Sequence, residues 1–200
     1  MRKFFGLALV CVGLFTHAFP ASASPKDVVD GLFEEGAQAV EWRDVTIDLN
    51  KLKVYYTSEG AEFVWVADGQ LTRAGNELMS VLERVVEDGL NPKDYTELAF
   101  AALKRLSGEE DEAGAELALS QAYLRLARDL SGGRTSPSLN STTIVVERKS
   151  INAERWLTIA RTQGAVAAVS ALRPRHTQYG KLQKLLSTYR NYSALGGWDA

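Results

Sequence analysis

Histidine is the commonest catalytic base in proteins, and residues 24–200 contain one, His176. A catalytic triad needs a nucleophile beside that base and a third group that orients the base. The chain has neither a G-x-S-x-G nucleophile elbow nor an S-x-x-K pair. His176 follows a proline in LRPRHTQY and precedes a segment with helical spacing. We therefore interpret it as a helix-capping or surface residue.

The densest acidic run is at residues 109–112, where EEDE could attract a cation. A calcium loop interleaves its oxygen ligands with other residues and includes a glycine, and this run does neither. Acidic side chains are favourable in the first turn of a helix, so we interpret the run as a solvated helix start. Two carboxylates for glycoside cleavage would have to come from distant segments, and this possibility stays open without support.

Residues 132–134, Gly-Gly-Arg, offer flexible backbone and one cation, as an anion contact would. Because no G-x-x-x-x-G-K-[ST] or G-x-G-x-x-G pattern is present, we interpret them as a helix exit. Four tryptophans could stack on sugar rings: Trp42, Trp65, Trp156 and Trp198. Trp65 and Trp156 fall within expected elements and are predicted to be core residues, whereas Trp198 has no assigned role. The sequence thus assigns no catalytic, cofactor-binding or metal-binding residue.

Residues 1–23 have the three parts of a secretory signal: Arg2 and Lys3, an apolar run over 4–15, and Ala21-Ser22-Ala23 as a cleavage site. The apolar run is shorter than the roughly 20 residues that span a bilayer. We expect an exported, periplasmic protein with no stable membrane insertion after cleavage. An N-terminal anchor or a buried helix is the alternative.

Removal of residues 1–23 would leave 21 basic and 25 acidic side chains and no cysteine, since Cys11 lies in the signal. The lack of cysteine excludes disulfides, a thiolate nucleophile and a thiolate metal site. Mild acidity without a Lys/Arg cluster argues against nucleic acid as a partner. The remaining length suits one ordinary domain that needs no metal or cofactor to fold.

Hydrophobic periodicity predicts a mainly α protein, a single helical domain with a short β-hairpin or small β element. Helices are predicted at 71–89, 92–106, 109–130 and 153–163, with a frayed one at 27–41 and a last one carrying Tyr179 to Tyr189. The helix at 109–130 is apolar around more than half its surface, so we expect it to be central. LKVYYTSEGAEFVWV, residues 52–66, predicts a hairpin, with helical turns as the alternative, and TTIVVER predicts a strand.

Residues 89–95, GLNPKDY, join two of these helices. Gly89 suits the left-handed residue that ends a helix. Asn91 suits the N-cap of the next helix, Pro92 its first position and Asp94 its third. We interpret the stretch as a helix junction, with a sugar-binding role for Tyr95 as the alternative.

Five segments occur in the order of a known family: YYTSEGAEFVWV, GLNPKDY, AELALSQAYLRLARDLSGGR, LRPRHTQYGKLQKLLSTYR and GGW. They resemble the helical scaffold domain of the exported L,D-transpeptidases, the YkuD-type murein L,D-transpeptidase family. The resemblance covers about residues 45–198. Together with the signal at 1–23, it gives an expected lead segment at 24–44 and a scaffold domain at 45–200. Glu116 stands where the family usually has an aspartate.

Family members continue into a peptidoglycan-binding module and a catalytic domain. The cysteine of that domain forms an acyl-enzyme with a tetrapeptide stem and makes a 3→3 cross-link. These catalytic residues map onto no position of this chain. The resemblance implies a periplasmic, non-catalytic scaffold module linked to peptidoglycan cross-linking, with peptidoglycan or cell-wall enzymes as partners.

Two other readings follow from the residues. The chain could be a stand-alone peptidoglycan-binding or partner-binding adaptor. A hydrolase built from scattered Asp and Glu residues has no support from their spacing. We expect no transpeptidase activity from this chain alone.

Overall fold

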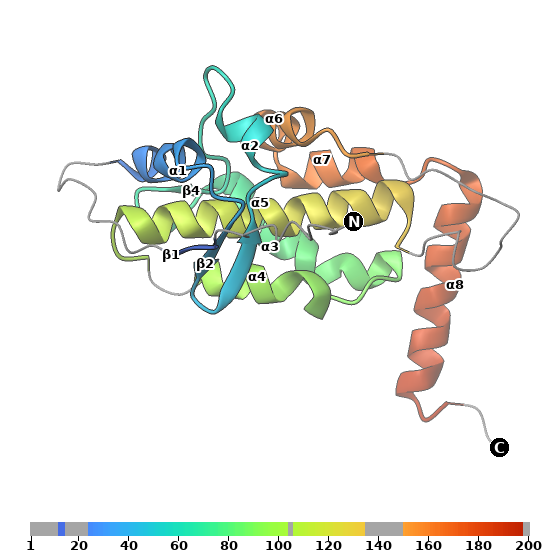
Figure 1. The fold of residues 1–200 in the computed structure, drawn as a ribbon. Coiled ribbons are helices and arrows are strands. Elements are labelled where there is room, and N and C mark those ends of the chain that lie inside the picture. Colours follow the sequence, from blue (N-terminus) through green and yellow to red (C-terminus); the bar gives the residue numbers. More distant parts are fainter. Residues whose placement is uncertain (1–11, 15–23, 104–105, 135–149, 198–200) are drawn as a thin grey trace, which may run out of the picture.

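The computed structural model describes residues 12–14, 24–103, 106–134 and 150–197 (Figure 1). Its helices are α1 Pro25–Glu34, α2 Lys53–Tyr56, α3 Arg73–Arg84, the 3₁₀ helix η1 Val85–Asp88, α4 Lys93–Leu103, α5 Glu109–Gly132, α6 Ala153–Gln163, α7 Ala165–Leu172 and α8 Thr177–Ala194. Its strands are β1 Val12–Leu14, β2 Ala39–Trp42, β3 Val45–Asp48, β4 Val66–Ala67 and β5 Gln70–Leu71. The predicted mainly α class with a small β element is confirmed.

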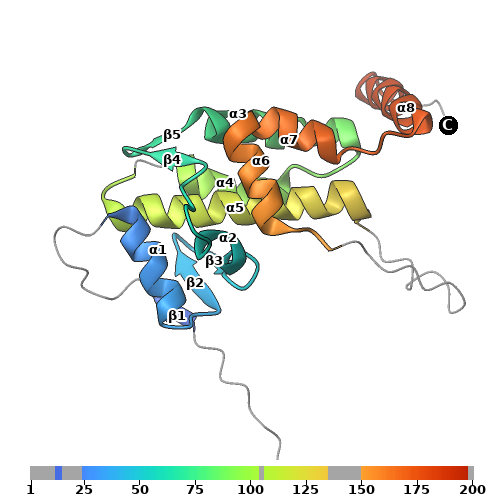
Figure 2. The same ribbon diagram turned by 90° about the horizontal axis from the view of Figure 1, so that it is seen from above.

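The helix α5 runs through the middle of the molecule, with α3 and α4 on one side and α1, α6 and α7 on the other (Figures 1 and 2). Its side chains are buried around most of its circumference, and Leu117, Leu119, Tyr123 and Leu126 have no exposed surface. A helix that is apolar on several sides must be covered on several sides. The central place predicted for residues 109–130 is therefore confirmed.

A hairpin that the sequence did not predict joins the end of the lead segment to the residues that follow it. β2 and β3 are antiparallel, with Val40 opposite Ile47, and β1 pairs in parallel with β2. The connecting Arg43 and Asp44 both have positive φ, +46° and +67°, as a two-residue hairpin turn requires. The helix predicted at 27–41 was wrong after Glu34, since the chain leaves α1 and enters β2.

The hairpin predicted at residues 52–66 was also wrong, and its alternative, short helical turns, is right for Tyr55 and Tyr56. Both lie in the one-turn helix α2, where they are 2% exposed. Adjacent residues of a strand point to opposite faces, so a strand would have exposed one tyrosine. The hairpin lies further on, between β4 and β5, where Asp68 and Gly69 have φ of +51° and +72°.

The helix junction at residues 89–95 is confirmed. Gly89 has φ +75°, and the Leu90 amide donates back to the Val85 carbonyl over 3.2 Å. Asn91 Oδ1 accepts from the Lys93 amide at 3.2 Å, at the start of α4. Tyr95 is fully buried, which leaves no ring face for a sugar.

The later helices follow their predicted caps. Asn152 Oδ1 accepts from the Arg155 amide at 2.7 Å, and Gly164, with φ +90°, ends α6. The strand predicted from TTIVVER lies outside the described residues. Within the described parts of the chain, we find no helix that combines the length and the apolar character needed to cross a membrane.

Candidate functional site

His176 is the N-cap of α8. Its Nδ1 accepts a hydrogen bond from the Gln178 amide at 3.3 Å, and the residue is exposed. The capping interpretation is therefore confirmed.

The acidic run at residues 109–112 forms the first turn of α5, as predicted, but it is more than a solvated surface. Asp111 accepts from the Trp42 indole at 3.3 Å, from Arg43 at 2.8 Å and from the Ser107 amide at 2.9 Å. It therefore fastens the β2–β3 turn to α5. Among the described residues, no cluster of three His, Cys, Asp or Glu side chains is arranged to hold a metal ion.

Residues 132–134 are the exit of α5, as interpreted, with Gly133 at φ +73°. Arg134 forms an ion pair with Asp94 at the start of α4. Trp42 and Trp65 are core residues, at 5% and 0% exposure. Trp156 is partly buried against the core, and Trp198 lies outside the described residues.

A buried carboxylate on α5, Glu116, is the centre of a buried polar network. One oxygen accepts from the Tyr56 hydroxyl at 2.6 Å and the Val64 amide at 2.8 Å. The other accepts from the amides of Trp65 at 2.8 Å and Val66 at 3.1 Å. Burial raises the pKa of Glu116 to about 7, and the hydrogen bonds from Tyr56 and the three amides oppose that rise.

Ser120, one turn further along α5, completes this network. Its hydroxyl lies 2.6 Å from the Tyr56 hydroxyl and accepts from the Trp65 indole at 2.7 Å. In the described residues no buried side-chain polar atom lacks a hydrogen-bond partner. A fully satisfied buried network fixes one arrangement of its members, so α2 and residues 64–66 are held rigidly on α5.

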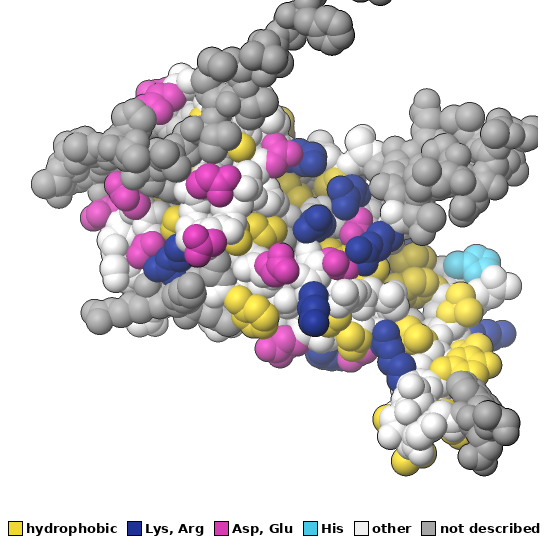
Figure 3. All heavy atoms as spheres, turned by 60° about the horizontal axis from the view of Figure 1, so that its bottom comes forward, with side chains coloured by type: hydrophobic (Ala, Val, Ile, Leu, Met, Phe, Trp, Pro, Cys, Tyr) yellow, Lys and Arg dark blue, Asp and Glu magenta, His cyan; other side chains and the backbone are white. Residues whose placement is uncertain are grey.

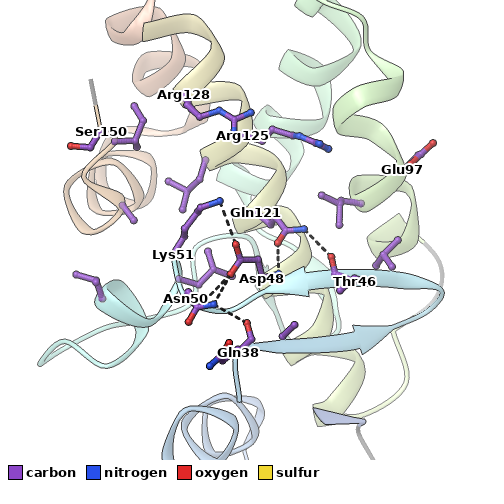
Figure 4. Close-up of a pocket in the computed structure, with 18 of the residues that line it drawn as sticks. Gln38, Thr46, Asp48, Asn50, Lys51, Glu97, Gln121, Arg125, Arg128 and Ser150 are labelled. Atoms are coloured by element: carbon purple, nitrogen blue, oxygen red, sulfur yellow. Dashed lines mark hydrogen bonds and ion pairs between the residues drawn. The ribbon is translucent and has the colours of Figure 1, made fainter. Parts of the chain in front are cut away.

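Beside this network is an open groove of about 1150 Å³, which we call the hairpin groove. Its walls come from the β2–β3 hairpin, the turn that follows it, α4, α5 and the N-terminus of α6 (Figure 4). The side chains of Leu52, Leu98 and Leu124 give it an apolar lining. Polar lining comes from Gln38, Thr46, Asn50 and Gln121, and charged lining from Asp44, Asp48, Lys51, Glu97, Arg125 and Arg128.

Gln121 closes the free edge of β3 in this groove (Figure 4). Its side-chain oxygen accepts from the Asp48 amide at 2.5 Å, and its side-chain nitrogen donates to the Thr46 carbonyl at 3.0 Å. These are the two bonds that a neighbouring strand would make. The amide of Gln121 thus protects the edge from pairing with another chain.

The cations of the groove differ in their partners. Lys51 lies 3.3 Å from Asp48, and Arg128 lies 2.9 Å from Asp129. Arg125 donates to the Asp94 carbonyl at 2.9 Å and forms no ion pair with any acidic side chain of the described residues. Arg125 is exposed and is one of the residues that line the groove.

The helix α8 projects from one end of the molecule (Figures 1 and 2). Its contacts with the body are mainly polar, with Leu186 half-buried near Gly89. Asp88, whose side chain is 1% exposed, accepts from Tyr179 and Gln183 of α8, both at 2.8 Å, and from Arg173 just before it. Arg190 donates to the Val86 carbonyl. The described residues of α8 include no buried side chain.

One flank of α8, beside the side that contacts the body, is apolar and exposed (Figure 3). Leu182 is 62%, Leu185 48%, Tyr189 48% and Tyr192 53% exposed. Their spacing of three and four residues places them on one stripe, which we call the α8 stripe. Lys181 and Lys184 lie near this stripe, and α8 contains no acidic residue.

A family described as the scaffold domain matches residues 50–186. The chain belongs to the scaffold-domain family. The scaffold domain here spans α2 to the first half of α8, and α1 and the β2–β3 hairpin precede the match. Searches of curated proteins and of solved structures found no match.

Three features of this site were not predicted from the sequence. Glu116 was noted only as a departure from a family pattern, yet an acid between Ala115 and Leu117, within the run of small and apolar residues at 113–119, is a usable signal. The groove needs Arg125 and Gln121 of α5 beside the β2–β3 hairpin, and that hairpin was not predicted. The exposure of the α8 stripe had no signal, because its spacing is that of an ordinary amphipathic helix.

Proposed function

We propose that this scaffold domain is the non-catalytic module of an exported L,D-transpeptidase and supports peptidoglycan cross-linking and cell-wall remodelling. The observation that carries the proposal is the family match over residues 50–186, which coincides with the motif order that resembles that enzyme family. The chemistry would come from a separate cysteine-bearing part.

The structure suits a module that positions other parts. The network of Glu116, Tyr56 and Ser120 fixes the body around α5, while the hairpin groove and the α8 stripe lie on its surface. A rigid body with exposed binding faces can hold a catalytic partner and its substrate in a defined relation.

The first experiment incubates the purified protein with disaccharide-tetrapeptide muropeptides and analyses the products by mass spectrometry. We expect no 3→3 dimer. Formation of that dimer by the protein alone would overturn the non-catalytic role.

The second experiment adds the protein to the purified catalytic domain of an L,D-transpeptidase and measures binding and the yield of 3→3 dimer. We expect binding, weakened in a Leu182→Ser/Leu185→Ser variant. Val166→Ser, which changes a 52%-exposed residue of α7, is the matched control. If the protein neither binds the catalytic domain nor changes the yield of dimer, the proposed role as a module of an L,D-transpeptidase is contradicted.

Export is the third part of the proposal and rests on residues 1–23. Expression in a Gram-negative host, followed by fractionation and N-terminal sequencing, should give a periplasmic product that begins near Ser24. A product that keeps Met1 and stays in the cytoplasm would contradict export.

A partner-binding adaptor is the second candidate function, and the α8 stripe favours it. An exposed apolar stripe beside basic residues fits a partner surface that is apolar with an acidic rim. A pull-down on purified sacculi distinguishes an adaptor that binds peptidoglycan from one that binds only proteins. Retention on sacculi supports direct wall binding, and absence from the pellet restricts the adaptor to protein partners.

A further inference from the structure

We propose that the hairpin groove binds a short peptide through a free carboxylate held by Arg125. The inference rests on the groove alone and is independent of the L,D-transpeptidase proposal. It assigns a ligand class to a surface formed partly by the β2–β3 hairpin, which precedes the residues matched by the scaffold-domain family.

Arg125 is oriented and retains free donors. Its Nη1 donates to the Asp94 carbonyl at 2.9 Å, which fixes the position of the guanidinium at the rim of the groove. A guanidinium has five N–H donors, so this one bond leaves most of them available. No acidic side chain of the described chain pairs with Arg125, whereas Lys51 and Arg128 have Asp48 and Asp129. Two parallel N–H groups of arginine match the two oxygens of a carboxylate.

The charges around Arg125 favour a carboxylate over a phosphate. Arg128 lies three residues further along α5 and therefore on the same side of the helix. Asp44, Asp48 and Glu97 also line the groove. They would repel a doubly charged phosphate more strongly than a single carboxylate.

The rest of the lining fits peptide groups. Gln38 carries a side-chain amide that can both donate to and accept from a peptide backbone. Asn50 can accept through Oδ1, while its Nδ2 already donates to the Gln38 carbonyl and to Asp48. Leu52, Leu98 and Leu124 are 1%, 7% and 8% exposed and form the apolar floor of the groove, against which small side chains can pack. The volume of about 1150 Å³ exceeds the roughly 300–1,000 Å³ of a typical small-molecule site, as an extended ligand requires.

The closed edge of β3 sets how the peptide lies. Because Gln121 already bonds the Asp48 amide and the Thr46 carbonyl, the peptide cannot join β3 as an added strand. It lies across the apolar lining instead, with its carboxylate at Arg125. Recognition therefore depends on the terminal charge more than on backbone pairing.

The experiment titrates the ¹⁵N-labelled protein with acetyl-Ala-Ala-Ala as the free acid and as the C-terminal amide. We expect the free acid to shift resonances of groove residues and to bind about tenfold more tightly than the amide, as a charged hydrogen bond implies. Arg125→Gln should remove this preference, and Arg125→Lys should keep part of it. Arg84→Gln changes an exposed arginine of α3 outside the groove and should keep all of it.

Equal binding of acid and amide to the unmodified protein would overturn the proposal, as would the absence of any shift in the groove. A preference for the acid that survives in Arg125→Gln would also overturn it. The comparison of the free-acid peptide with the amide peptide uses the unmodified protein. It therefore tests the proposal even if a variant misfolds. A matched peptide that ends in D-alanine distinguishes the two possible origins of the ligand. Tighter binding of this peptide supports a cell-wall peptide, and tighter binding of the L form supports the C-terminus of a protein.

Discussion

The Tyr56 hydroxyl donates a 2.6 Å hydrogen bond to the Glu116 carboxylate, and this bond joins the one-turn helix α2 to the centre of α5. The same carboxylate accepts three consecutive backbone amides, from Val64 to Val66. One side chain thus replaces the partners that a strand would have supplied to this irregular segment. This explains how residues 61–65 are held against α5 without helix or strand structure.

Glu116→Ala should destabilise the protein by roughly 3–5 kcal/mol, because three buried amides and the Tyr56 hydroxyl would lose their acceptor. Urea unfolding followed by circular dichroism measures the loss. Glu110→Ala, in the exposed first turn of α5, is the control and should change stability by less than about 0.5 kcal/mol. Similar stabilities of the two variants would show that the network contributes little.

Stability should fall as pH rises from about 4.5 to about 7. The unfolded chain releases the Glu116 proton near the ordinary value of 4.5, whereas burial raises the pKa in the folded protein to about 7. Between these values the folded state holds more protons, so raising the pH favours unfolding, by on the order of 3 kcal/mol. Other carboxylates also titrate, and the comparison with Glu116→Gln isolates this residue. A wild-type pH profile parallel to that of the variant would refute the effect.

Gly114→Ala should destabilise the protein, although alanine is the better helix former. A Cβ at Gly114 would lie 2.4 Å from atoms of the Trp42 ring. Overpacking of this kind costs about 1–3 kcal/mol, more than the gain in helix propensity. Gly180→Ala, in the exposed first turn of α8, meets no atom within 4 Å and should stabilise that helix by up to about 1 kcal/mol. Thermal unfolding of the two variants should therefore move in opposite directions.

Asp88→Ala should release α8 from the body while α5 stays protected. The variant removes the acceptor for Tyr179, Gln183 and Arg173 in one step. Without these bonds, local opening of α8 costs less free energy. Amide hydrogen exchange over residues 177–194 should therefore be about tenfold faster or more. Glu87→Ala, whose carboxylate pairs with Arg84 on the surface, is the matched control. Unchanged exchange in α8 would show that Asp88 is not its anchor.

Helix ends and helix positions could be predicted where they depend only on residues that are close in sequence. The glycine at 89, the asparagines at 91 and 152 and the apolar spacing of residues 109–130 each indicate one structure, because capping and helix periodicity act within a few residues. Residues 52–66 were mispredicted because aromatic residues favour strands on average. In the folded protein Tyr56 bonds to Glu116 and Ser120 of α5, and Tyr55 donates to the Glu62 carbonyl. Tertiary contacts overrode the propensity.

The site was less predictable than the fold, because its parts are distant in sequence. Glu116 lies 60 residues from Tyr56, and Gln121 lies 73 residues from Asp48. Single residues such as Arg125 carry no signal until the hairpin is placed beside α5. His176 is the contrast, since its capping role depends only on its neighbours and could be predicted.

Most surface helices bury their apolar residues, whereas the α8 stripe of this helix lies in solvent. Because α8 has no buried side chain, its release from Asp88 would expose little new apolar surface. The heat capacity of unfolding depends mainly on apolar exposure, so detachment of α8 should add little to it. In scanning calorimetry, detachment of α8 should appear as a small, broad transition below the main unfolding transition. Binding of a partner over the α8 stripe should instead give a negative heat-capacity change in titration calorimetry.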